Sequence, residues 1–266
     1  MYVLGIDIGS TSSKVVIMDE TENIIASAVA IGGAGTSGPD RVIGEAFAKS
    51  GLTWHNISLT VATGYGRMSF EKANKQISEI TCHALGVYHL LPSVRTIIDI
   101  GGQDVKAISI SSSGLVTKFA MNDKCAAGTG RFLEVMARVL ETDIGRLADL
   151  AKTADSVVDI SNTCTVFAES EVISRLASGV KPSNIAAGIH ESVARRVAGL
   201  VKRVGVNPTI VLTGGVAQNQ GIVSALAYEL KHPVTVAPNC QITGAIGAGL
   251  LALREVNAER SAGKIK

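Results

Sequence analysis

The chain has no charge excess of either sign and no segment suited to anchoring it in a membrane. Lys and Arg number 25 against 23 Asp and Glu, so the formal net charge is only +2 at pH 7. This balance gives no broad electrostatic footprint for nucleic acid or an anionic membrane. The apolar start at 1–9 is too short for a signal peptide, and no other stretch reaches membrane-spanning length without charges or turns. We therefore expect a cytoplasmic protein that binds neither nucleic acid nor membrane.

Cysteine is scarce, and no Cys-x-x-Cys pair occurs. The four cysteines, Cys82, Cys125, Cys164 and Cys240, are expected as thiols or metal ligands in a reducing cytosol. Cys125 and Cys164 each precede an apolar-periodic run that predicts a helix, where the helix dipole favours a thiolate. A Cys₄ cluster would then need two cysteines from each subunit of a two-fold dimer. From spacing alone, buried structural cysteines are the favoured alternative.

Strand and helix signals alternate along the chain. Short Val- and Ile-rich runs indicate strands, and apolar residues recurring every three to four positions indicate helices. Strands are predicted at 2–8, 14–19, 23–31, 57–63, 95–100, 105–110, 115–120, 209–213 and 234–237. Helices are predicted from Thr36 to about 50, over 72–90, from an N-cap at Ser183 to about Gly205, and over 243–253. After Cys164 a further helix is predicted to bury a stripe of Val172, Ile173, Leu176 and Ala177.

A weak internal repeat divides the chain into two related halves. Gly-Ile-Asp-Ile-Gly-Ser-Thr at 5–11 and Ile-Asp-Ile-Gly-Gly-Gln at 98–103 place Asp7 and Asp99 at equivalent strand ends, 92 residues apart. A chain of 266 residues can hold two medium-sized domains. We therefore predict an α/β protein with an N-terminal lobe at 1–93, a C-terminal lobe at 94–254 and a polar tail at 255–266, the C-terminal helix possibly completing the first lobe.

The first repeat ends in a loop suited to phosphate. Gly9 lets the backbone approach an anion closely, and Asp7 could hold hydrated magnesium. Hydroxyl and ammonium donors follow directly at Ser10, Thr11, Ser12, Ser13 and Lys14. A hairpin whose glycine merely permits the turn is the alternative for this loop taken alone.

Two further glycine loops could complete a nucleotide site. Gly101, Gly102 and Gln103 could contact the opposite side of the phosphates, with Asp99 as a second magnesium-shell carboxylate and Gln103 or Asp104 orienting attacking water. In the third loop, Gly214 and Gly215 allow close approach to a purine or ribose, and Gln218 could hydrogen-bond it. A packing turn is the alternative there. No Gly-x-x-x-x-Gly-Lys-[Ser/Thr] pattern or complete dinucleotide fingerprint occurs.

Taken together, these motifs resemble those of the actin, sugar-kinase and heat-shock-protein-70 ATPase superfamily. Within it, the chain is similar to the activators of 2-hydroxyacyl-CoA dehydratases over nearly its whole length. The resemblance is carried by the motifs at 4–11, 63–67, 98–104, 121–132, 164–171 and 213–219.

The resemblance implies two ribonuclease-H-like lobes with mixed sheets and a nucleotide cleft between them. It also implies a homodimer that holds one [4Fe–4S] cluster through Cys125 and Cys164 of both subunits, with ATP or ADP and magnesium in each. Asp7, Gln103 and Asp104 are the expected catalytic residues. Reduced ferredoxin or flavodoxin would supply an electron, which the activator delivers to the dehydratase in an ATP-dependent reaction.

Three other functions stay open at this point. The partner could be a benzoyl-CoA reductase-like system, since the ATPase subunits of those reductases share much of the pattern. A small-molecule kinase would share the nucleotide loops, but it gives no reason for Cys125 and Cys164 to precede helices. A non-catalytic ATP-dependent scaffold is the third. Cys82, His83 and Cys240 are expected to be packed structural residues, and the acyl-CoA substrate and electron donor are unspecified.

Overall fold

The computed structural model describes residues 1–122, 126–161 and 164–263, and the chain divides into two compact units. The first unit consists of Met1–Pro92, Ser112–Val116 and Gln241–Lys266. The second consists of Ser93–Ser111 and Thr117–Cys240. The C-terminal helix therefore belongs to the same unit as the N-terminal strands.

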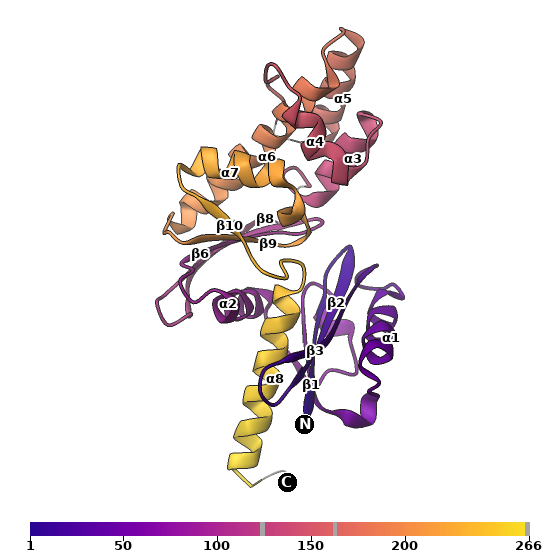
Figure 1. Ribbon diagram of the computed structural model, residues 1–266, viewed down its shortest axis with the longest axis vertical. Coiled ribbons are helices and arrows are strands. Elements are labelled where there is room, and N and C mark those ends of the chain that lie inside the picture. Colours follow the sequence, from indigo (N-terminus) through magenta and orange to yellow (C-terminus); the bar gives the residue numbers. More distant parts are fainter. Residues whose placement is uncertain (123–125, 162–163, 264–266) are drawn as a thin grey trace. The chain divides into compact units, whose positions relative to one another are not determined.

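The first unit is built on a five-stranded mixed sheet (Figure 1). Its strands lie in the order β3-β2-β1-β4-β5, with β1, β2 and β3 antiparallel and β4 and β5 parallel to β1. The strands are β1 (Tyr2–Ile8), β2 (Ser12–Asp19), β3 (Ile24–Ile31), β4 (Ile57–Thr63) and β5 (Lys75–Gln76). The helices are α1 (Gly38–Ser50), α2 (Glu79–Leu90) and α8 (Thr243–Ser261), with short 3₁₀ turns at Trp54–Asn56 and Arg67–Ser69.

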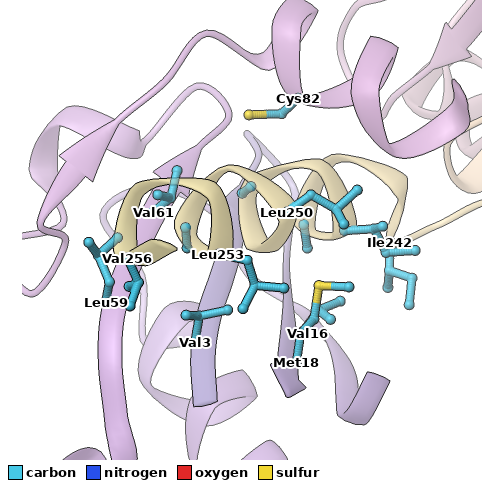
Figure 2. Close-up of a cluster of buried hydrophobic side chains, with 14 residues drawn as sticks. Val3, Val16, Met18, Leu59, Val61, Cys82, Ile242, Leu250, Leu253 and Val256 are labelled. Atoms are coloured by element: carbon cyan, nitrogen blue, oxygen red, sulfur yellow. The ribbon is translucent and has the colours of Figure 1, made fainter. Parts of the chain in front are cut away.

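The alternation of side chains along β1 sends its residues to two different cores. Leu4, Ile6 and Ile8 join the cluster that includes Val42 and Ile43 of α1. Val3 faces the other way, into a cluster with α8 and Cys82 of α2, as Figure 2 shows. Since the period is two, Gly5 and Asp7 share this second face with Val3, and Asp7 lies at its end.

Helix α8 lies close to the sheet because glycines line its contacts. A Cβ atom on Gly5 would lie 2.2 Å from the carbonyl oxygen of Ala245, and one on Gly247 would lie 1.8 Å from that of Cys82. Real Cβ atoms do not approach backbone this closely, so only glycine fits at either position. The backbones of β1, α8 and α2 are thereby held in direct contact.

The second unit repeats the sheet of the first. Its strands lie in the order β10-β9-β6-β7-β8, with β6 antiparallel to β7 and parallel to β9, and β10 parallel to β9. This arrangement confirms the predicted internal repeat, β6 standing where β1 stands. The strands are β6 (Thr96–Ile100), β7 (Val105–Ile110), β8 (Val116–Asn122), β9 (Ile210–Thr213) and β10 (Val234–Val236). The helices are α3 (Gly130–Val139), α4 (Leu147–Lys152), α5 (Thr165–Ala177), α6 (Pro182–Val204) and α7 (Gln220–Leu230), with 3₁₀ turns at Ile144–Arg146 and Gly215–Gln218.

Several predicted helix boundaries are wrong. The helix predicted over 72–90 begins only at Glu79, because β5 pairs with β4 and the Asn74 side chain accepts a hydrogen bond from the Thr60 N–H. The N-cap of α6 is Lys181 and not Ser183, since Pro182 occupies the first turn. Helix α8 continues to Ser261, beyond the predicted end at 253.

The buried stripe predicted for α5 is also wrong. Of its four members only Val172 is buried, whereas Ile173 is 52% exposed. Val166 and Phe167, at the start of the same helix, are 65% and 69% exposed. The apolar residues of α5 thus form an exposed face, which sequence periodicity cannot distinguish from a core-facing one.

Replacing Gly247 with alanine should destabilise the first unit. The new methyl group would meet the Cys82 backbone, which cannot move aside as a flexible side chain could. We expect Gly247→Ala to lower the free energy of unfolding by roughly 3 kcal/mol, the upper end for overpacking. Urea unfolding followed by circular dichroism measures this. Gly44→Ala is the matched control, because a Cβ atom on Gly44 would meet nothing within 4 Å; equal stability of the two variants would contradict the close α2–α8 contact.

Candidate functional site

The loop between β1 and β2 is a tight turn with open hydroxyls. The Gly9 N–H donates to the Ser12 carbonyl at 3.0 Å, and the Gly9 carbonyl accepts from the Ala34 N–H. Ser13 is fully buried and donates to the Gly32 carbonyl at 2.8 Å. The hydroxyl-bearing residues of the loop that are partly open to solvent are therefore Ser10, Thr11 and Ser12.

Asp7 and Lys14 form an ion pair beside this loop. They are register partners on β1 and β2, and Lys14 Nζ lies 3.5 Å from Asp7 Oδ2. Asp7 is 4% exposed. Gly64, whose φ is +88°, brings its backbone against the carboxylate, because a Cβ there would lie 2.4 Å from Asp7 Oδ1. Residues 7 and 9–14 are thus brought together in the first unit.

The loop after β6 repeats this turn. The Gly101 N–H donates to the Asp104 carbonyl at 3.0 Å, as Gly9 does to Ser12. Gln103 is exposed at the tip, whereas the Asp104 carboxylate bonds Lys106 Nζ at 2.8 Å. Of the two residues predicted to orient water, Gln103 is the more exposed, whereas the Asp104 side chain is 21% exposed and is held by Lys106.

Lys106 is a site residue that the sequence reasoning missed. Its ammonium lies 3.1 Å from Asp99 Oδ2, and Asp99 and Lys106 are register partners as Asp7 and Lys14 are. Lys106 is 2% exposed and Asp99 is 3% exposed. The signal was present in the sequence, because both repeats read Asp-Ile-Gly followed five residues after the glycine by Lys, at 14 and 106.

The third glycine loop packs against the second one. Gly214, at φ +89°, has room only for hydrogen, since a Cβ would lie 2.8 Å from Asp99 Oδ1. Its N–H and the Thr213 hydroxyl both donate to the Cys240 carbonyl, at 2.8 and 2.7 Å. Gly215 and Gln218 are exposed in the 3₁₀ turn that follows. Residues 99, 101–104, 214, 215 and 218 therefore gather at one end of the second sheet.

A buried histidine supports the end of this third loop. His190 of α6 is 3% exposed, and burial lowers its pKa to about 4. Its ring packs against Gly221, where a Cβ would lie 2.7 Å from the imidazole. His190 is thus neutral at physiological pH and acts as packing between α6 and α7.

Helix α3 is hydrogen-bonded directly to the glycine loop after β6. The Gly130 N–H donates to the Gly101 carbonyl and the Arg131 N–H to the Gly102 carbonyl, both at 2.9 Å. These two residues are the first of α3. Any displacement of the loop backbone at 101–102 would therefore be passed to the start of α3.

The predicted cluster ligands are described only in part. Cys164 is the N-cap residue of α5, and its carbonyl accepts the Ala168 N–H at 3.0 Å. The preceding loop is held by the Glu171 side chain, which accepts the Ser161 N–H at 2.9 Å. Cys125 lies outside the described residues.

The described cysteines differ in burial, and therefore in how well each could act as a metal ligand. Cys82 is completely buried, and this burial raises its pKa to about 12, so it stays a protonated thiol. Cys240 is 9% exposed, whereas Cys164 is partly exposed at a helix start. Among the described cysteines, Cys164 is therefore the most accessible to a ligand, and its role as a cluster ligand stays a prediction. Within the described ranges no three His, Cys, Asp or Glu side chains gather as a metal site.

Two sheets of the same order, each with an Asp-x-Gly turn after its first strand, define the actin and sugar-kinase fold. A ROK family glucokinase from Streptomyces griseus shares this fold with a TM-score of 0.58, over 96% of this chain and 100% of that one, at 14% identity. The chain belongs to the BadF/BadG/BcrA/BcrD ATPase family, whose model matches residues 4–252.

Relatives within this family are much closer. The activator of lactoyl-CoA dehydratase from Anaerotignum propionicum is 58% identical over 252 residues, covering 95% of this chain and 97% of that protein. The solved activator of the 2-hydroxyisocaproyl-CoA dehydratase from Clostridium difficile, with bound ADPNP, has a TM-score of 0.95 and 51% identity, over 100% of this chain and 98% of that one. No helix in the described part of the chain is both long and apolar enough to cross a membrane.

Removing the Lys106 charge should destabilise the second unit. The change would leave the Asp99 and Asp104 carboxylates close together without their shared cation. We expect Lys106→Met to lower the free energy of unfolding by about 3 kcal/mol, as for other broken buried pairs. Lys152→Met is the matched control, because its pair with Asp149 is exposed, and it should change the denaturation midpoint little. Equal midpoints for the two variants would contradict the importance of the buried pair.

Proposed function

We propose that this protein is the ATP-hydrolysing, iron–sulfur activator of a 2-hydroxyacyl-CoA dehydratase. Its similarity to the lactoyl-CoA and 2-hydroxyisocaproyl-CoA dehydratase activators supports the partner class. The observation that carries the mechanism is the pair of backbone hydrogen bonds from Gly130 and Arg131 to the loop at 101–102. They connect an ATP-binding loop to the helix that follows Cys125.

In this proposal the two Asp-x-Gly loops bind the phosphates. The open donors of the first loop are Ser10, Thr11, Ser12 and Lys14. In the second loop the Gly101 N–H closes the turn on the Asp104 carbonyl, so the backbone of Gly102 and Gln103 would contribute instead. Gly215 and Gln218 are exposed at the same end of the second sheet as the second loop, and in this proposal they contact the adenosine. The exposed Gln103 is our choice to orient the attacking water.

Magnesium would be held through water by Asp7, with Asp99 as a second candidate. When bound, the ion would neutralise phosphate charge. Asp7 is the better donor, because its oxygen lies 3.5 Å from Lys14 whereas Asp99 is bonded at 3.1 Å to Lys106. A carboxylate with a looser partner can turn toward a hydrated cation at lower cost.

We further propose a homodimer formed around the start of α5. Val166, Phe167 and Ile173 expose apolar surface next to Cys164, and such patches are typical of protein interfaces. A two-fold axis near this helix would bring together Cys164 from both subunits. The resemblance to the dehydratase activators assigns Cys125 as the second ligand of each. A [4Fe–4S] cluster bound there would supply one-electron chemistry.

The energetics of the proposed reaction are adequate. Raising the driving force of one electron by about 300 mV takes roughly 7 kcal/mol, since 59 mV is a factor of ten for a one-electron couple. ATP hydrolysis can supply this. Strain at 101–102 would reach α3 through the Gly130 and Arg131 N–H groups. Reduced ferredoxin or flavodoxin is the proposed electron donor.

The cluster proposal is tested by iron and sulfide analysis of anaerobically purified protein, with electron paramagnetic resonance after dithionite. We expect about four irons per dimer, the content of one such cluster. Cys164→Ala should lose them, because α5 then presents no thiolate. Cys240→Ala is the control and should retain them, since that cysteine is buried. Iron-free wild-type dimers under strict anaerobiosis would refute the proposal.

The nucleotide proposal predicts that the ATP and cluster sites can be separated. Lys14→Gln should lower ATPase turnover and dehydratase activation about tenfold or more. The reason is that losing a charge-assisted hydrogen bond to the phosphate raises the activation free energy by about that rate factor. Absorbance near 400 nm should stay unchanged. Lys49→Gln, on the surface of α1 in the same unit, is the matched control. Loss of the cluster spectrum together with ATPase activity would contradict separate sites.

A further inference from the structure

His83 is an imidazole buried within a few ångströms of the proposed ATP site. It lies on α2 and is 5% exposed, as a packed residue should be. Its Nδ1 atom lies 3.1 Å from the hydroxyl of Thr243, which is fully buried and is the first residue of α8. The pair joins residues 160 positions apart in the sequence. It therefore attaches α2 to the start of α8.

The other ring nitrogen of His83 faces the same turn that Asp7 contacts. A Cβ atom on Gly244 would lie 3.1 Å from His83 Nε2 and 3.1 Å from Asp7 Oδ2. The Gly244 backbone thus contacts both the imidazole and the carboxylate, and a Cβ atom there would be tighter than an ordinary contact against each of them. A shift of this turn by a few tenths of an ångström would change the position of Asp7.

The first turn of α8 also contributes electrostatically to the Asp7 position. Its N-cap residue is Ile242, which makes no side-chain cap, and Asp7 is the acidic group beside this end. The positive end of a helix dipole favours a carboxylate placed there. Gly86 of α2 keeps the turn close, because a Cβ there would lie 2.0 Å from the Thr243 carbonyl oxygen.

We infer that His83 is a positioning residue for Asp7. By its hydrogen bond to Thr243 it holds the first turn of α8 against the carboxylate, and so sets where Asp7 presents its oxygens to magnesium and phosphate. The inference rests on the proposed role of Asp7 in ATP binding. No proton transfer is involved, since the role needs only the Nδ1–Oγ1 hydrogen bond. Simple packing by His83 would predict no dependence on that bond.

Amide variants of His83 test which ring nitrogen is needed for ATPase activity. The asparagine amide places its polar atoms near Nδ1, whereas the longer glutamine amide places them near Nε2. We expect His83→Ala to lower the ATPase kcat about tenfold, equivalent to about 1.4 kcal/mol, with the ATP KM within about twofold. His83→Asn should restore most of this loss, and His83→Gln should not. Thr243→Val, which removes only the hydroxyl, should reproduce the loss.

A steric variant and a double mutant add independent readouts. Gly244→Ala should also lower kcat, because its methyl group would press on both Asp7 and His83, whereas Gly44→Ala has open space and serves as its control. If His83 acts through Asp7, then adding His83→Gln to Asp7→Asn should lower kcat no further. Thermal unfolding of each dimer identifies any loss that reflects the folded fraction alone.

The outcomes distinguish this inference from the proposed function. Rescue by asparagine alone, together with non-additivity, supports the positioning role. Equal activity of the asparagine and glutamine variants, full additivity, or losses that only follow the folded fraction would overturn it. If Asp7→Asn itself leaves ATPase activity intact, the proposed role of Asp7 fails, and the inference fails with it. If Asp7→Asn abolishes activity while the His83 variants are normal, only the positioning role is refuted.

Discussion

The structure of both units depends on a buried Asp–Lys pair between the first two strands. Asp7 with Lys14 and Asp99 with Lys106 are register partners that sit where a tight glycine turn closes each hairpin. Burying an ionised carboxylate without a cation costs free energy because the charge loses its water. Each lysine offsets this desolvation cost for its aspartate. The pairs also differ. Lys106 is shared with Asp104, whereas Lys14 lies farther from its partner and remains partly exposed.

Glycines allow the neighbouring helix and loop to pack closely against these paired strands. Gly5 and Gly247 place α8 against β1 and α2, and Gly214 places the third loop against Asp99. At each position a methyl group would collide with backbone or with the carboxylate itself. The arrangement leaves little freedom at the ends of β1 and β6. Both aspartates are therefore held by backbone as well as by their lysines.

The connection between α3 and the second loop gives the proposed coupling its physical path. The Gly130 and Arg131 N–H groups stand at the start of a helix, where backbone donors have no partner within the helix. They are satisfied instead by the loop carbonyls at 101–102. In the proposed mechanism the same contacts that complete the helix would transmit strain from the loop. The exposed Val166 and Phe167 at the start of α5 offer apolar surface for the proposed dimer.

The sequence by itself determined every described strand except β5, together with the internal repeat, the glycine turns and the family, because all of these depend on local patterns and spacing. The tertiary structure decided what depends on neighbours. It buried Ser13, tied Asp104 to Lys106 and left the apolar face of α5 exposed. It also brought His83 and Asp7 to the first turn of α8, where His83 hydrogen-bonds Thr243 across 160 positions of sequence. Periodicity shows that a helix or strand has an apolar face, but only packing shows which group that face contacts.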